Sequence, residues 1–132
     1  MPNYNRYARS AEAGDAEANY RLGVCYQHGK GVQGDMFLAS EYYEAAASEG
    51  HAEAQFALGA CYGRGRGVKK SHVNACEWYA RAAAQGHGKA AFNLALRYTE
   101  GLGVPKDVSL AAMWFKFAAG AEGWRLLCCC RC

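Results

Sequence analysis

Apolar residues recur along this chain at intervals of three and four positions. In the first such stretch they stand at Ala18, Leu22, Cys25, Tyr26 and Gly29. This spacing places them on one face of an α-helix, which turns once every 3.6 residues. A second apolar stretch follows, and its alanine and aromatic positions also share one face. We therefore expect two helices that pack against each other.

Glycines separate the two helices of this pair. The turn Gly29-Lys30-Gly31-Val32 ends the first helix, because glycine adopts a positive φ without strain, and its valine is expected to turn back between the helices. Similar turns stand at 65–68 and 101–104, and the helices after the three turns are predicted over 36–48, 72–85 and 108–119. We call the first helix of each pair helix A and the second helix B.

The helix pair is repeated every 36 residues. Leu22, Leu58 and Leu94 keep this spacing, as do the turn glycines and the alanine pairs near the end of each helix B. A period of this length is typical of a solenoid, in which each unit buries its apolar face against the next and leaves an extended surface for binding. We predict an all-α solenoid of three units, over 14–49, 50–85 and 86–120.

The segments between and around the units fit this division. Asp15, His51 and His87 precede the three A helices at the N-cap position. Residues 1–13 align with the end of a helix B and are predicted to form a partial helix that caps the first unit. Residues 121–132 lack the landmarks of another helix A and form a cysteine-rich tail.

These landmarks together resemble the Sel1-like repeat, a relative of the tetratricopeptide repeat, over 14–119. The opening A-x-A-x-x-x-L-G-x-x-Y runs from Ala16 to Tyr26, the turn G-x-G-V follows, and the close W/Y-Y-x-x-A-A runs from Tyr42 to Ala47. Tetratricopeptide repeats have 34 residues and lack this turn. The resemblance implies a right-handed α-α superhelical solenoid that acts as a non-catalytic adaptor for protein complexes.

In related solenoids helix A lines the concave side, so a partner is expected on the face opposite the buried leucine. We call this surface the helix-A groove and predict that it binds a peptide or a partner helix. Its predicted residues recur at the same helix positions in all three units. They are Glu17, Tyr20, Val24, Gln27, His28, Glu53, Phe56, Ala60, Arg64, Lys89, Phe92, Leu96 and Glu100.

The aromatic residues Tyr20, Phe56 and Phe92 form a ladder at one repeat position. One interpretation is that they grip the partner while the changing polar residues select it. The alternative is that they pack against adjacent helices and belong to the core. The sequence leaves both open.

Composition and charge exclude several other functions. The 132 residues carry a formal net charge of +3 with basic and acidic residues intermixed, unlike the basic stripe of a nucleic-acid binder. Neither a secretory leader nor a run of membrane-spanning length is present. We therefore expect a cytoplasmic protein with a protein or peptide partner and no nucleic acid.

The seven cysteines divide into three scattered residues and a terminal cluster. Cys25 and Cys61 share one repeat position and are expected about 10 Å apart, too far for a disulfide, and Cys76 lies on another helix. We expect reduced thiols. The cluster Cys128, Cys129, Cys130 and Cys132 suggests lipidation that would make the chain a membrane-tethered adaptor, with metal binding or an unmodified tail as alternatives.

Three suggestions of other chemistry are weaker. Residues 29–34 spell G-x-G-x-x-G, but a dinucleotide site needs a strand before this motif, and here a helix is predicted. A cysteine-rich branch of the resembled family is associated with β-lactam binding, yet its cysteine pairing across seven residues is not matched. His51 and His87 lack companions at metal-ligand spacing. We predict no catalysis, cofactor or metal.

One charged segment has two interpretations. The turn after the second helix A is basic and contains Arg64, Arg66, Lys69, Lys70 and His72. It is either a surface for an acidic partner or an ordinary solvated loop.

Overall fold

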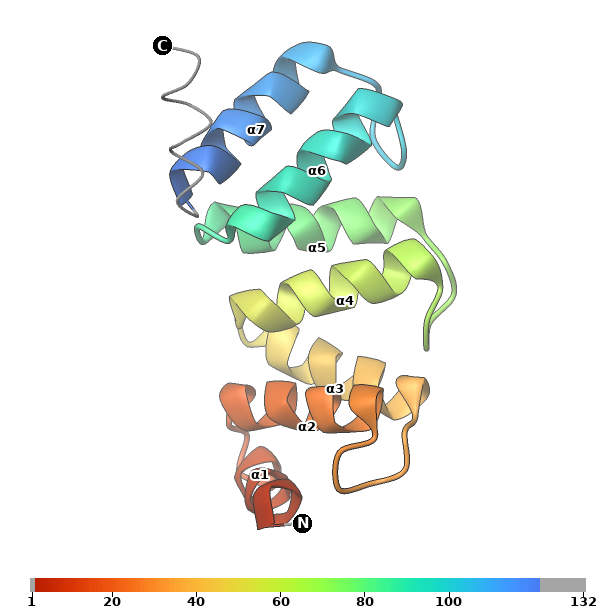
Figure 1. Cartoon of the computed structure of the whole chain (residues 1–132), viewed down its shortest axis with the longest axis vertical. Helices are drawn as coiled ribbons and strands as arrows, with labels where there is room; N and C mark the ends of the chain where they lie inside the picture. Colours follow the sequence, from red (N-terminus) through yellow and green to blue (C-terminus); the bar gives the residue numbers. More distant parts are fainter. Residues whose placement is uncertain (1, 122–132) are drawn as a thin grey trace.

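A computed structural model describes residues 2–121 of the protein, which form helices and turns with no strand. The helices are α1 (Pro2–Glu12), α2 (Ala16–His28), α3 (Met36–Ser48), α4 (Ala52–Arg64), α5 (His72–Ala84), α6 (Gly88–Glu100) and α7 (Val108–Ala121). In Figure 1 they follow one another along the long axis, and each packs against its neighbours in the chain. The predicted solenoid of three helix pairs after a short N-terminal helix is confirmed.

The ends of helix A have the residues that the repeat predicts. Asp15 accepts a hydrogen bond from the Glu17 N–H at 3.0 Å, and the Nδ1 atoms of His51 and His87 accept equivalent bonds from backbone N–H groups at 3.1 Å. Three glycines end these helices in the left-handed conformation, with φ from 68° to 72°, and they are Gly29, Gly65 and Gly101. Side-chain caps and left-handed glycines satisfy backbone groups that a helix end leaves open.

Leucines from helix A and alanines from helix B form the core between the helices. Leu22, Leu58 and Leu94 are at most 2% exposed, and Ala39 and Ala75 are fully buried. Alanine lets two helices approach closely, so the larger leucine side chains fill the remaining space. The helix-A face differs from the prediction at two positions, because Tyr26 is half-buried and stacks on Tyr42, while Gly29 is exposed.

The turn glycines have a second role that the sequence does not reveal. Gly67 lies against the beginning of α3 in the preceding unit, where the Ser40 hydroxyl donates a hydrogen bond to the Gly67 carbonyl oxygen at 3.2 Å. In the next unit the Cys76 thiol donates to the carbonyl oxygen of Leu102 at 3.2 Å. The second and third glycine turns therefore join their own units to the helix B before them.

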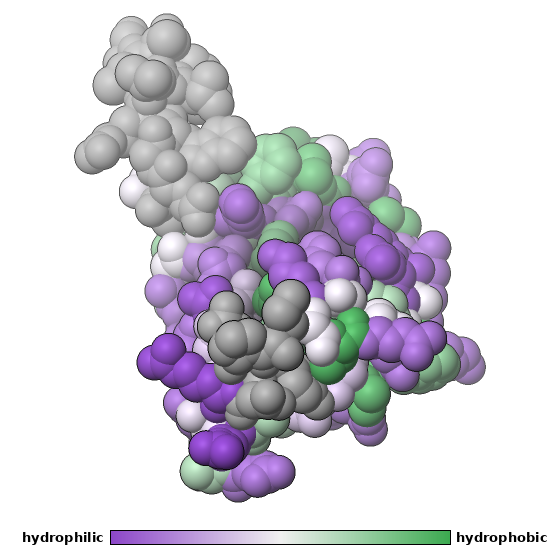
Figure 2. Space-filling model, turned by 60° about the horizontal axis from the view of Figure 1, so that its bottom comes forward, coloured by the Kyte–Doolittle hydropathy of each residue, from purple (hydrophilic) through white to green (hydrophobic). Residues whose placement is uncertain are grey.

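The predicted ends of helix B are slightly displaced. α5 ends at Ala84, with Gln85 as its cap, and α7 continues to Ala121. No helix within residues 2–121 is long and apolar enough to cross a membrane. The tail with Cys128, Cys129, Cys130 and Cys132 lies outside the described residues, so its lipidation stays a hypothesis. Figure 2 shows that the surface around the N-terminal end is largely hydrophilic, with small separate hydrophobic areas.

Candidate functional site

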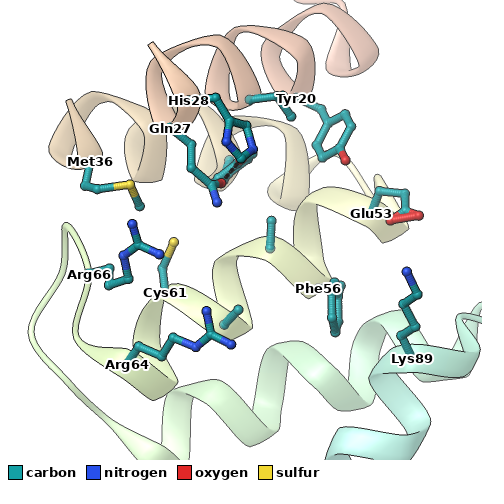
Figure 3. Close-up of a pocket in the computed structure, with 14 residues that line it drawn as sticks. Tyr20, Gln27, His28, Met36, Glu53, Phe56, Cys61, Arg64, Arg66 and Lys89 are labelled. Carbon is teal, nitrogen blue, oxygen red and sulfur yellow. Dashed lines mark hydrogen bonds between the residues drawn. The ribbon is translucent and has the colours of Figure 1, made fainter. Parts of the chain in front are cut away.

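A pocket of about 400 Å³ lies between α2 and α4. Residues from α2, α3, α4, the turn after α4 and the beginning of α6 line it. Nine of its residues belong to the predicted helix-A groove, and they are Tyr20, Val24, Gln27, His28, Glu53, Phe56, Ala60, Arg64 and Lys89. Figure 3 labels seven of the nine, and their side chains lie around a common space.

Five lining residues were not predicted from the sequence: Met36, Tyr43, Ala57, Cys61 and Arg66. Tyr43 comes from helix B and reaches the pocket across α2, because Gly23 has no side chain. A Cβ atom at Gly23 would lie 2.6 Å from the Tyr43 ring. The Tyr43 hydroxyl donates a hydrogen bond to Gln27 Oε1. In the sequence, this contact could have been inferred from a glycine in helix A and a tyrosine in helix B that keep fixed repeat positions.

The aromatic ladder is partly packed and partly open to the pocket. Tyr20 stacks on the ring of His51 with 4.8 Å between ring centroids, and Phe56 stacks on His87 at the same distance. Both aromatic side chains are half-buried and also line the pocket. The two rings therefore pack against neighbouring side chains and also line the pocket, and contact with a partner stays a prediction.

The two histidines that receive this stacking also link successive units. Nε2 of His51 lies 2.7 Å from Glu17 Oε1, and Nε2 of His87 lies 3.0 Å from Glu53 Oε1. Each histidine thus contacts a carboxylate of the preceding unit through one ring nitrogen while the other caps its own helix. The hydrogen bond with His51 is the main reason why the pKa of Glu17 is lowered.

Four predicted groove residues lie outside this pocket. Glu17 contacts His51 and also Arg21, at 2.6 Å. Leu96 and Glu100 are exposed on α6, and Phe92 packs edge-on against Phe115 with 5.4 Å between centroids.

The third unit differs because Arg97 stands where Cys61 stands in the second. Its guanidinium lies 5.9 Å from the centroid of the Tyr79 ring. A Cβ atom at Gly63 would lie 2.6 Å from Arg97 Nη2. The arginine side chain therefore lies over the Tyr79 ring, whereas the equivalent ring of Tyr43 is among the residues that line the pocket. A small residue at the position of Cys61 leaves this hollow between the first two units.

The basic turn after α4 is divided between two surroundings. All four cationic side chains of the turn are exposed, but only Arg64 and Arg66 also line the pocket. His72 contacts Arg97 through its Nδ1 atom. Both interpretations of the turn, a surface for an acidic partner and a solvated loop, stay open.

Burial raises the pKa values of three groups that line the pocket, which are the side chains of Tyr20, Tyr43 and Cys61. Tyr43 is 1% exposed, and burial is the main reason why its pKa is raised well above the ordinary value of about 10. Burial also raises the pKa of the Cys61 thiol, against the positive charges of Arg66 and Arg64. Cys25, Cys61 and Cys76 are free and buried.

We expect the raised pKa of Tyr43 to make folding pH-dependent in alkali. Below about pH 10 both folded and unfolded chains keep the Tyr43 proton, and above it the unfolded chain loses the proton first. The free energy of unfolding should therefore fall by up to about 1.4 kcal/mol per pH unit from this group. Urea unfolding between pH 9 and pH 11 (about one unit either side of the ordinary tyrosine pKa) measures it. A Tyr43→Phe variant with the same slope as the wild type would contradict the assignment.

The described residues show no arrangement for metal binding. No group of three or more His, Cys, Asp or Glu side chains within 2–121 is placed to hold an ion. The G-x-G-x-x-G motif at 29–34 follows helix α2 rather than a strand, so its surroundings differ from those of a dinucleotide site.

Comparison with known proteins identifies the repeat. The model of the Sel1 repeat matches the chain at 16–51, 52–87 and 88–121. A Sel1 repeat protein from Oxalobacter formigenes is 35% identical with a TM-score of 0.81, over 83% of this chain and 45% of that one. No curated protein sequence matches the chain.

Two further solved structures are similar. One is c5321, a protective antigen of uropathogenic Escherichia coli with an SLR fold, which is 34% identical with a TM-score of 0.85, over 89% of this chain and 25% of that one. The chain thus spans less than half the length of c5321 and of the Oxalobacter formigenes protein. The other is cysteine-rich protein B of Helicobacter pylori, at 19% identity and a TM-score of 0.71 over 90% of both chains. At this identity it shows the fold alone.

Proposed function

This chain belongs to the Sel1 repeat family, and from this premise we propose that it binds a peptide segment of a partner protein in the pocket between α2 and α4. Sel1 repeat proteins are generally scaffolds for protein interactions. The observation that carries the proposal is a hollow of about 400 Å³ lined by two half-buried aromatic rings and several polar side chains.

The lining suits an extended peptide. Tyr20 and Phe56 are already held by stacking on histidines, so little rotational freedom is lost when a ligand packs against them. Apolar walls beside a few polar groups are typical of sites that bind by burial and select by hydrogen bonds and charge. The partner would bridge the first two units of the solenoid.

Filling the pocket is the sharpest test of this proposal. Ala60 lines the pocket, and Ala60→Trp is expected to reduce the affinity for peptides selected against the wild type from a random library by at least about ten-fold, since the indole occupies their space. Fluorescence anisotropy with the selected, labelled peptides measures this. Truncating Phe56 is a less clean change, because its ring also packs on His87.

The matched control places the same indole outside the pocket. Ala45 is exposed on α3, so Ala45→Trp should keep wild-type affinity. Circular dichroism establishes that both variants are folded. Selected peptides that bind folded Ala60→Trp as tightly as the wild type would disprove binding in this pocket.

A further inference from the structure

One end of the pocket carries two arginines. Arg64 is the last residue of α4, and Arg66 stands in the turn that follows. In Figure 3 both extend from the same side, and Cys61 lies between them. Within residues 2–121 neither guanidinium has a hydrogen-bond or ion-pair partner. Both positive charges act on the Cys61 thiol and counteract the rise of its pKa, which agrees with this geometry.

The other ionisable residues of the lining do not balance this charge. Glu53 is the carboxylate among the described lining residues, and its Oε1 atom contacts His87 at 3.0 Å. Lys89 lies near Glu53 at the far end in Figure 3. Lys89 stands at the repeat position of Glu17 and Glu53, so the third unit contributes a cation where the earlier units contribute anions. The pocket therefore has a surplus of positive charge.

The arginine pair is particular to the second unit. The positions of Arg64 and Arg66 hold His28 and Lys30 in the first unit, and Glu100 and Leu102 in the third. The first and third units build the same helix end and turn without these arginines, so the fold does not require them. A planar guanidinium binds a carboxylate through two parallel hydrogen bonds.

From this geometry we infer that Arg64 and Arg66 bind a carboxylate of an acidic peptide whose neighbouring side chains lie against Tyr20 and Phe56. The inference rests on the proposed function and specifies the class of partner. The carboxylate belongs either to the C-terminus of the partner or to an aspartate or glutamate side chain. In both cases the arginines donate hydrogen bonds to a carboxylate.

The test is a selection of random peptides in two formats, one with free C-termini and one with the C-termini fused to the display protein. Acidic peptides should be enriched by the wild type. Their affinity should fall at least about ten-fold in Arg64→Gln/Arg66→Gln, as expected when charge-assisted hydrogen bonds are removed. Enrichment in the free format alone assigns the terminal carboxylate, and enrichment in both formats assigns a side chain.

The matched control removes two charges that lie outside the pocket. Lys69 and Lys70 are exposed in the same turn, so Lys69→Gln/Lys70→Gln should keep the affinity within about two-fold, because screened surface charges contribute little. An equal loss in both double variants would show a nonspecific charge effect and overturn the inference.

Failure of the inference is distinguishable from failure of the proposed function. Neutral or basic peptides that are enriched with their C-termini fused, and whose binding is lost in Ala60→Trp, would overturn the carboxylate at the arginines and leave the pocket standing. If no peptide is enriched, or if all enriched peptides bind Ala60→Trp unchanged, the proposed function fails and the inference with it.

Discussion

Leu58→Ala is expected to lower the free energy of unfolding by about 2–5 kcal/mol, because truncation of a buried leucine loses transfer free energy and leaves a cavity. Leu58 is fully buried. It belongs to a cluster in which Tyr43 and alanines of α3 meet α4, so the first and second units both lose contacts. Urea unfolding followed by circular dichroism measures the change.

A surface leucine provides the control for this substitution. Leu96 is 39% exposed on α6, and alanine has the higher helix propensity, so Leu96→Ala should change the free energy of unfolding by no more than about 0.5 kcal/mol. Similar losses in the two variants would mean that Leu58 does not hold the units together.

Gly67→Ala is expected to destabilise the protein by about 2–5 kcal/mol, from backbone strain and overpacking together. Gly67 has a φ of 78°, which a residue with a Cβ atom adopts only with strain. The added Cβ atom would lie 2.2 Å from the Met36 carbonyl oxygen. Because that oxygen belongs to the backbone of α3, the contact is relieved only if the turn moves away from the preceding unit. Chemical unfolding measures the loss.

Gly86→Ala separates the two causes. Gly86 has a φ of 93°, and a Cβ atom added there would meet nothing within 4 Å beyond its neighbours in the chain. Alanine at this position therefore introduces strain without a clash, and a loss of about 1–2 kcal/mol is expected. The excess loss in Gly67→Ala then measures the contact between units. Equal losses would show that the glycine turn does not need close approach to α3.

Much of the fold follows from local pattern. The 36-residue spacing of Leu22, Leu58 and Leu94 predicts the three helix pairs, since a helix buries residues three and four apart. The caps at His51 and His87 follow from their equivalence to Asp15. These features depend on a residue and its near neighbours in the chain, so they can be predicted from the sequence alone.

The candidate site follows from the sequence only in part. The helix positions of Tyr20, Phe56 and Ala60 place them on the face that lines the pocket. The sequence does not predict that Tyr43 crosses α2 at Gly23, nor that Arg66 turns from a loop into the hollow. Both depend on the space that other side chains leave.

The sequence by itself determined a solenoid of three helix pairs and the face on which a partner is sought. The tertiary structure alone decided where that face is hollow: it is open beside Cys61 and covered by Arg97 one unit further on. The physical reason is that the periodicity of the sequence determines on which side of its helix a residue lies. A cavity depends instead on the volumes of side chains that come from two successive units. The contacts of Glu17 with His51 and of Glu53 with His87 likewise join side chains from two successive units.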